Sequence, residues 1–223
     1  MWKALAFKDI RETIGIAALG LLALILAASA AMRIAVDPTG LVMGGGPHDS
    51  EIPFVGGTFK SHFTVISFLL VAALGFRQSL GEMFQSGYLY LFHRPISLAR
   101  VLAVKMIVGI FIYLVCGAIS ILAVGLWAQT PGTHASPFEW SMTIPVWRVW
   151  LSMPVIYLGA MLSGMRPARW AGTRLAPLVG VMVLTALIQD LPSWMILGPL
   201  SLLAVAAVLI INIVSVSRTR DYA

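Results

Sequence analysis

The sequence predicts an all-α, polytopic membrane protein with six transmembrane helices, an N-terminal interfacial helix and both chain ends in the cytoplasm. Three observations lead to this prediction. Hydrophobic residues make up 59% of the chain and charged residues only 11%, whereas a soluble domain carries about 25% charged residues. The apolar residues lie in runs of about 20, the length that crosses a bilayer core of roughly 30 Å. Basic residues collect at alternate ends of these runs, as in other membrane proteins.

The elements follow in order from the N-terminus. Residues 1–13 mix Trp2, Phe7 and Ile10 with basic residues, a composition typical of a short helix on the inner membrane surface. Each following apolar run is expected to be a helix, because backbone groups in lipid must be hydrogen-bonded within the segment. The expected spans cover about residues 14–35, 62–78, 101–127, 144–164, 175–190 and 194–217, within a single transmembrane domain of residues 1–223.

The first run has an alternative interpretation as a cleaved signal peptide. Ala28-Ser29-Ala30 resembles a signal-peptidase site after an apolar stretch. However, the stretch is long for a signal peptide, and Asp9 and Glu12 lie among the basic residues before it. We therefore expect this run to be retained as the first span.

Charge placement predicts the orientation of the chain. With the N-terminus inside, the outer side holds only Arg33, Lys60 and Arg148 of the 15 basic residues. The cytoplasmic side holds the other 12, which are Lys3, Lys8, Arg11, Arg77, Arg94, Arg100, Lys105, Arg166, Arg169, Arg174, Arg218 and Arg220. This asymmetry agrees with the positive-inside rule and with an even number of spans. We expect a multi-pass protein of the plasma membrane or inner cell membrane.

The lysine positions argue against ATP hydrolysis by this chain. None of its four lysines follows a glycine, so a phosphate-binding loop of the form G-x-x-x-x-G-K-[ST] is absent. The net charge of +6 is explained by membrane topology and lipid headgroup contacts, so no nucleic-acid partner is expected.

An intramembrane enzyme is a rival class. Ser163 lies near the inner end of the fourth span, but no histidine follows it and His93 is the only inner histidine, so a serine hydrolase set is missing. His48, Asp49 and Glu51 could hold a metal ion, but an exposed acidic loop is favoured because a Gly-rich segment has no preset geometry. We expect no catalytic, cofactor or metal site.

Charged residues are absent from the centres of the expected spans, unlike those of many ion-coupled transporters. Lys105 and Arg148 lie near span ends, where long side chains are expected to extend toward water. The spacing Ala160-x-x-x-Gly164 suits close helix packing. The polar residues Ser120, Thr185, Gln189 and Asn212 are expected to make helix–helix hydrogen bonds.

Residues 79–100 form a segment that spanning alone does not explain. The segment is too long for a tight turn, faces the cytoplasm in the predicted topology and is rich in aromatic residues. On a helix, Phe84 and Tyr88 would share one side, which predicts an amphipathic helix at the inner surface. Arg94-Pro95 ends it, because a residue before proline disfavours helical conformations, and Ser97 can cap the next helix. A plain interfacial helix with no partner remains the alternative.

The same segment carries a more specific pattern, which reads Glu82, Ser86-Gly87, Arg94-Pro95-Ile96-Ser97, Arg100 and Lys105. This pattern resembles that of the permeases of ABC (ATP-binding cassette) type 2 transporters. The chain departs from the family where it has Ser86-Gly87 in place of the frequent Gly-Thr, and Leu89 in place of a second acid.

The resemblance implies a function and a set of partners. The chain would be the transmembrane permease subunit of an ABC exporter, paired with a second permease copy or a sister permease. ATP would be bound by separate ATPase subunits, and the residues expected to form the ATPase-coupling segment are Glu82, Ser86, Gly87, Arg94, Pro95, Ser97, Arg100 and Lys105. The alternative that stays open is a six-span membrane scaffold or assembly factor without transport activity.

Overall fold

The computed structural model describes residues 2–32, 54–55, 58–84, 98–130, 138–166, 171–191 and 193–219. Within these ranges the chain is helical and contains no strand. The helices are α1 (Trp2–Ala31), α3 (Thr58–Phe84), α5 (Leu98–Gln129), η1 (Trp140–Thr143), α6 (Ile144–Met165), α7 (Ala171–Gln189) and α8 (Trp194–Thr219). Six of them are long and apolar enough to cross a membrane. The prediction of an all-α protein with six membrane-spanning helices is therefore confirmed.

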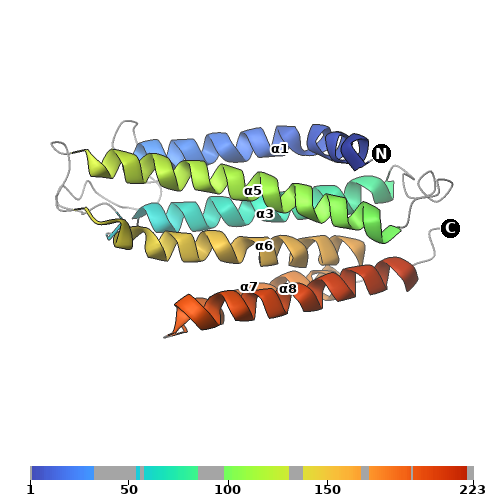
Figure 1. Ribbon diagram of the computed structural model, residues 1–223. Coiled ribbons are helices and arrows are strands. Elements are labelled where there is room, and N and C mark those ends of the chain that lie inside the picture. The colour runs from blue at the N-terminus through green and yellow to red at the C-terminus, as the bar shows by residue number, and fades with distance from the viewer. Residues whose placement is uncertain are drawn as a thin grey trace.

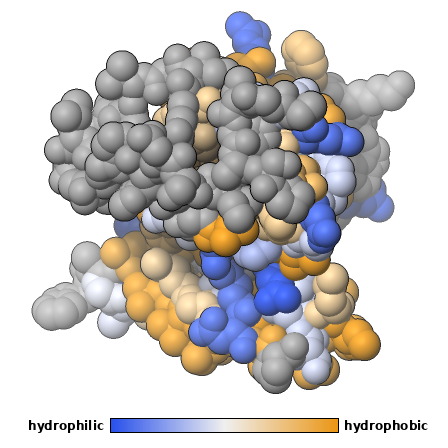
Figure 2. Space-filling view, turned by 90° about the vertical axis from the view of Figure 1, so that its left-hand side faces the viewer, coloured by the Kyte–Doolittle hydropathy of each residue, from blue (hydrophilic) through white to orange (hydrophobic). Residues whose placement is uncertain are grey.

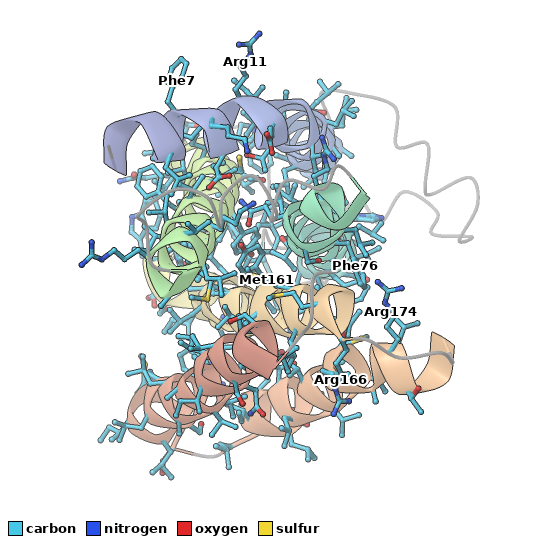
Figure 3. The ribbon with its side chains drawn as sticks, turned by 90° about the vertical axis from the view of Figure 1, so that its right-hand side faces the viewer. Phe7, Arg11, Phe76, Met161, Arg166 and Arg174 are labelled. Carbon is cyan, nitrogen blue, oxygen red and sulfur yellow. The ribbon has the colours of Figure 1, made fainter. Side chains whose placement is uncertain are left out.

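The helices form an up-and-down bundle in which α1 begins and α8 ends at the same end (Figure 1). We name this the terminal end, and the opposite end, where α6 and α8 begin, the far end. Viewed along the bundle, α1 lies on one side, α3 and α5 come next, α6 follows, and α7 and α8 lie on the other side (Figure 3). An even number of helices along the bundle places the start of α1 and the end of α8 at the same end, and the charge pattern also predicts an even number of spans. Which end faces the cytoplasm remains a prediction from that pattern.

Helix α6 is the central element of the bundle. Of an 18-residue stretch within its span, 72% is buried inside the protein, against 17% of the corresponding stretch in the span of α1. It packs against α3 on one side and against α7 and α8 on the other. The outer helices keep many large apolar side chains exposed, such as Leu19 on α1 and Ile211 on α8. Lipid tails are as apolar as these side chains, so the exposed side chains need no protein partner.

Small residues allow α3 and α6 to pack closely. A Cβ atom on Gly75 would lie 2.8 Å from the Cβ of Ala160 and equally close to the backbone oxygen of Tyr157. On the other helix, a Cβ atom on Gly164 would overlap the hydroxyl group of Ser79. The Ala160-x-x-x-Gly164 spacing thus serves close packing, as the sequence predicts.

Helix α7 contains a proline, and α6 supplies polar groups beside it. Pro177 lies inside α7, and the next backbone N–H, of Leu178, donates to the Oγ of the buried Ser163 at 3.1 Å. Arg174 donates from Nη2 to the carbonyl oxygen of Gly164 at 3.1 Å, near the end of α6. The serine that we considered as a nucleophile therefore accepts a backbone hydrogen bond between two helices.

The expected N-terminal interfacial helix is continuous with the first span. Helix α1 has no break between Trp2 and Ala31, but its first turns, with Phe7 and Arg11, run across the terminal end and not along the bundle (Figure 3). The Thr13 hydroxyl donates to the carbonyl oxygen of Asp9 at 2.7 Å. Such bonds from a hydroxyl to the preceding turn often bend helices.

Two of the four polar span residues make the expected contacts between helices. Ser120 on α5 donates to the carbonyl oxygen of Leu24 on α1 at 3.2 Å, and Gln189 on α7 donates to Ser152 on α6 at 3.0 Å. The other two differ from expectation, because Thr185 donates to Val181 and Met182 and Asn212 to Val208, all within their own helices. A carbonyl of the preceding turn is always within reach of such side chains.

Candidate functional site

A buried ion pair joins α1 to α5 near the terminal end of the bundle. The Nζ of Lys105 lies 3.6 Å from Oδ1 of Asp9, and each side chain is only 1% exposed. Both residues lie in the first turns of their helices. A lysine or an aspartate is almost never fully buried unless it is paired. The pair is therefore a buried, charged site inside an otherwise apolar bundle.

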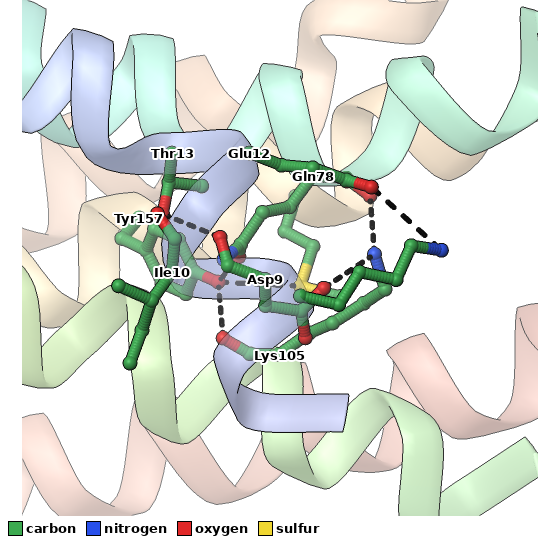
Figure 4. A network of polar contacts seen from close by, with 9 residues as sticks. Asp9, Ile10, Glu12, Thr13, Gln78, Lys105 and Tyr157 are labelled. Atoms are coloured by element: carbon green, nitrogen blue, oxygen red, sulfur yellow. Dashed lines mark hydrogen bonds and ion pairs between the residues drawn. The ribbon is translucent and has the colours of Figure 1, made fainter. Parts of the chain in front are cut away.

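A glutamine and a tyrosine extend the pair to two further helices. Lys105 also donates from Nζ to the backbone oxygen of Gln78 on α3, at 3.4 Å. The hydroxyl group of Tyr157 on α6 donates to Oε1 of Gln78 and lies 3.2 Å from the backbone oxygen of Lys105. We name Asp9, Gln78, Lys105 and Tyr157 the four-helix polar network (Figure 4). Each of these residues comes from a different helix of the bundle.

The packing around Tyr157 depends on a glycine. Tyr157 is fully buried, and a Cβ atom on Gly109 of α5 would lie 2.5 Å from its hydroxyl oxygen. A side chain at position 109 would therefore push the tyrosine away from Gln78. The Nε2 of Gln78, which is itself buried, has no hydrogen-bond partner among the described residues. A buried amide that lacks a partner costs free energy, so the hydrogen bonding of Gln78 is incomplete within the described residues.

The network can hold helices together but has no evident catalytic set. Its one anion and one cation balance, and a buried pair of this kind costs much more when one partner is removed than when both are replaced. A hydrolase needs a nucleophile beside a base, and the described members of the network supply no such pair. Among the described residues there is also no group of three or more His, Cys, Asp or Glu that could hold a metal ion.

The structure differs from the expectation for Lys105. The sequence suggested that this side chain would extend toward water at a span end, whereas it turns inward to Asp9. Water is not the only polar environment near the start of α5, because the Asp9 carboxylate and the Gln78 carbonyl oxygen lie 3.6 Å and 3.4 Å from the Nζ of Lys105. Arg100, one turn earlier on α5, is exposed and remains accessible at the terminal end.

The other residues of the expected coupling segment are only partly described. Glu82 lies in the last turn of α3, which extends to Phe84 and so beyond the expected end of the span at residue 78. Its side chain lies outside the described set, as do Ser86, Gly87, Arg94, Pro95 and Ser97 and the amphipathic helix expected there. The candidate metal ligands His48, Asp49 and Glu51 also lie outside the described residues. The structure therefore does not test these predictions.

Sequence reasoning missed three of the four members of the network. The sequence pattern assigns Asp9 to a surface helix, and it does not distinguish Gln78 or Tyr157 from their neighbours. One signal was present, because an ionisable residue inside an apolar run such as that around Lys105 needs a partner. That partner lies 96 positions away in sequence, counted from residue 9 to residue 105, and no local pattern identifies it.

Comparison with known proteins adds no identification. No protein-family model matches the chain, and no curated protein or solved structure does so either.

Proposed function

We propose that this chain is the permease subunit of an ABC transporter of type 2, that it acts as an exporter, and that a separate ATPase subunit drives it. The observation that carries the proposal is the position of Lys105. This lysine ends the motif that resembles those permeases, and its buried ammonium group bonds to α1 and α3. The helices on either side of residues 85–97 are thus joined to each other and to the first turns of α1.

This connection suggests how force would pass into the bundle. In the proposal, the ATPase contacts the coupling segment through Glu82, Arg94 and Arg100. A displacement of that segment moves the end of α3 and the start of α5 together, since Lys105 and Gln78 are bonded. Asp9 transmits the movement to α1 and Tyr157 transmits it to α6. Rigid-body motion of this kind, in two paired permeases, is a recognised form of alternating access.

The absence of a phosphate-binding loop from the sequence supports a separate motor subunit, because transport against a gradient needs an energy source. A second permease copy, or a sister permease, would complete the pathway. A six-span scaffold that stabilises other membrane proteins is the competing function, and it requires no ATPase partner.

The proposal is tested by affinity purification of the tagged chain in mild detergent, with mass spectrometry of its partners. We expect an ATP-binding-cassette ATPase to co-purify with the unaltered chain. Charge reversals Glu82→Lys, Arg94→Glu and Arg100→Glu are expected to reduce the recovered ATPase at least about tenfold, as loss of a buried charge-assisted contact does.

The matched control is Lys60→Glu, which reverses an exposed charge at the far end and should leave ATPase recovery unchanged. If the unaltered chain purifies as a stable protein without any ATPase, the scaffold function is favoured. Recovery of the ATPase with all three reversals would show that this segment is not the docking surface.

A further inference from the structure

Arg148 is a charge at the far end for which the protein provides little compensation. It lies in the first turns of α6, directly after η1, and its side chain is partly buried. Its Nε is buried and has no hydrogen-bond partner among the described residues, which also offer it no carboxylate within ion-pair distance. Arginine keeps its charge under all ordinary conditions, so this group needs an acceptor.

The group that does contact Arg148 is itself a donor. The guanidinium carbon lies 5.2 Å from the ring centroid of Trp194, at the start of α8. Trp194 is only 6% exposed, and its Nε1 has no hydrogen-bond partner among the described residues. The ring is held against its own helix, since a Cβ atom on Gly198 would lie 2.7 Å from Nε1. By contrast, Trp150 of the same region donates to the Leu114 carbonyl oxygen at 3.0 Å.

Two contacting side chains, Arg148 and Trp194, therefore each carry a buried N–H group that has no acceptor among the described residues. Leaving such donors unpaired in a desolvated position costs free energy, and more so for the charged one. The chemistry that fits is an anionic oxygen group, because guanidinium and indole N–H groups can both donate to it. Phosphate matches the planar guanidinium fork better than a single carbonyl oxygen does.

The location favours a lipid as the source of that phosphate. Arg148 and Trp194 lie near the starts of their helices, at the depth where tryptophan and arginine meet lipid headgroups. Hydrophilic residues at this end lie between hydrophobic flanks (Figure 2). The residues next to Trp194 on α8, Met195, Ile196 and Leu197, are exposed apolar side chains that would contact acyl chains.

We propose that Arg148 and Trp194 form a binding site for the phosphodiester group of a membrane lipid at the far end of the bundle. The guanidinium group and the indole N–H donate to the phosphate oxygens, and the acyl chains lie along α8. The site involves neither the coupling segment nor the four-helix polar network, so it does not depend on the proposed transport function.

The test is native mass spectrometry of the purified chain, titrated separately with phosphatidylglycerol, phosphatidylcholine and inorganic phosphate. We expect both lipids to bind to the unaltered chain, and inorganic phosphate to bind far more weakly because it lacks acyl chains. Arg148→Gln should weaken lipid binding about tenfold, the factor expected for a lost charge-assisted hydrogen bond. Trp194→Phe, which keeps the ring and removes the N–H, should weaken it less. Lys60→Gln, a charge loss at the same end, should have no effect.

A second measurement separates a lipid site from an internal contact. We expect added phosphatidylglycerol to raise the thermal unfolding temperature of the unaltered chain and of Lys60→Gln, and to raise that of Arg148→Gln much less. If Arg148→Gln instead lowers the unfolding temperature in lipid-free detergent and keeps the full lipid response, the acceptor is a group of the protein and the proposal is wrong. The proposal also fails if inorganic phosphate binds as tightly as the lipids. If Arg148→Gln does not fold, an unchanged lipid response in both Arg148→Lys and Trp194→Phe contradicts it.

Discussion

At the scale of single residues, an ammonium group among apolar helices persists only where other groups replace water around it. Lys105 is surrounded in this way by the Asp9 carboxylate and the Gln78 carbonyl oxygen. Arg100 on the same helix is exposed and has no such requirement. Arg100 and Lys105, two of the three cations of the motif, thus play different parts in the proposed function, with Arg100 available to a partner and Lys105 holding the helices behind it.

The first prediction concerns the buried pair. Lys105→Met should reduce the free energy of unfolding by about 3–5 kcal/mol, because it removes the Lys105 cation from beside the buried Asp9 carboxylate. The double variant Asp9→Asn, Lys105→Met should recover much of that loss, since it removes both charges. Denaturation of the purified variants in mixed micelles measures these differences as a double-mutant cycle.

The control for this cycle is Arg100→Gln, which removes an exposed charge from the same helix and should change the unfolding free energy by less than about 0.5 kcal/mol. Additive effects of the Asp9 and Lys105 substitutions would mean that the two side chains are not paired in the membrane.

At the scale of elements, the centre of the molecule is the crossing of α3 and α6. Gly75 and Gly164 allow it, since a Cβ atom at either position would clash with the facing helix. In lipid, close packing replaces the hydrophobic effect as the main attraction between helices. The crossing also sets the positions of Gln78 and Tyr157, which lie on the same two helices. The polar network therefore depends on small residues at the crossing.

The second prediction tests this crossing with a pair of glycines. Gly75→Ala should destabilise the protein by about 1–3 kcal/mol, because the added methyl group meets the backbone of α6 and cannot be relieved by rotating a side chain. Gly180→Ala on α7 is the matched control, since no atom lies within 4 Å of the added Cβ. It should change the stability by less than about 1 kcal/mol, in the stabilising direction that helix propensity predicts. Equal effects of the two substitutions would contradict the close crossing.

At the scale of the whole molecule, the bundle has two chemically different ends. The terminal end has the start of α1, the end of α8, the polar network and exposed arginines such as Arg11 and Arg166. The far end has the tryptophans that precede and begin α6, together with Arg148 and Trp194. Excess basic charge favours the cytoplasmic side, so we expect the terminal end to face inward. The proposed ATPase and the proposed lipid would then bind on opposite sides of the membrane.

The third prediction concerns this orientation. The native Cys116 is buried, so single introduced cysteines should dominate labelling by a membrane-impermeant maleimide. In intact cells, Lys60→Cys at the far end should be labelled, whereas His93→Cys and Arg220→Cys should be labelled only after permeabilisation. Labelling of position 93 from outside the cell would reverse the orientation and remove the docking surface for a cytoplasmic ATPase.

The sequence predicts the transmembrane spans well, whereas it does not predict the four-helix polar network. The six spans follow from runs of apolar residues whose length matches the bilayer, so each is a local property. The sequence placed the start of the fourth span at residue 144, where α6 begins. The helices before and after residues 85–97 extend beyond the expected spans, to Phe84 and from Leu98, because hydrogen bonding within a helix continues past the apolar core into polar residues.

The sequence by itself determined that the chain has six apolar helices. An apolar segment of membrane length must hydrogen-bond its backbone groups within itself, and a helix does so. Only the tertiary structure decided that Asp9 and Lys105 share one buried site with Gln78 and Tyr157, and that Arg148 lies against Trp194. The physical reason is that the preference of apolar side chains for lipid acts on each segment separately. The pairing of two polar groups depends instead on which faces of distant helices come into contact in the folded bundle.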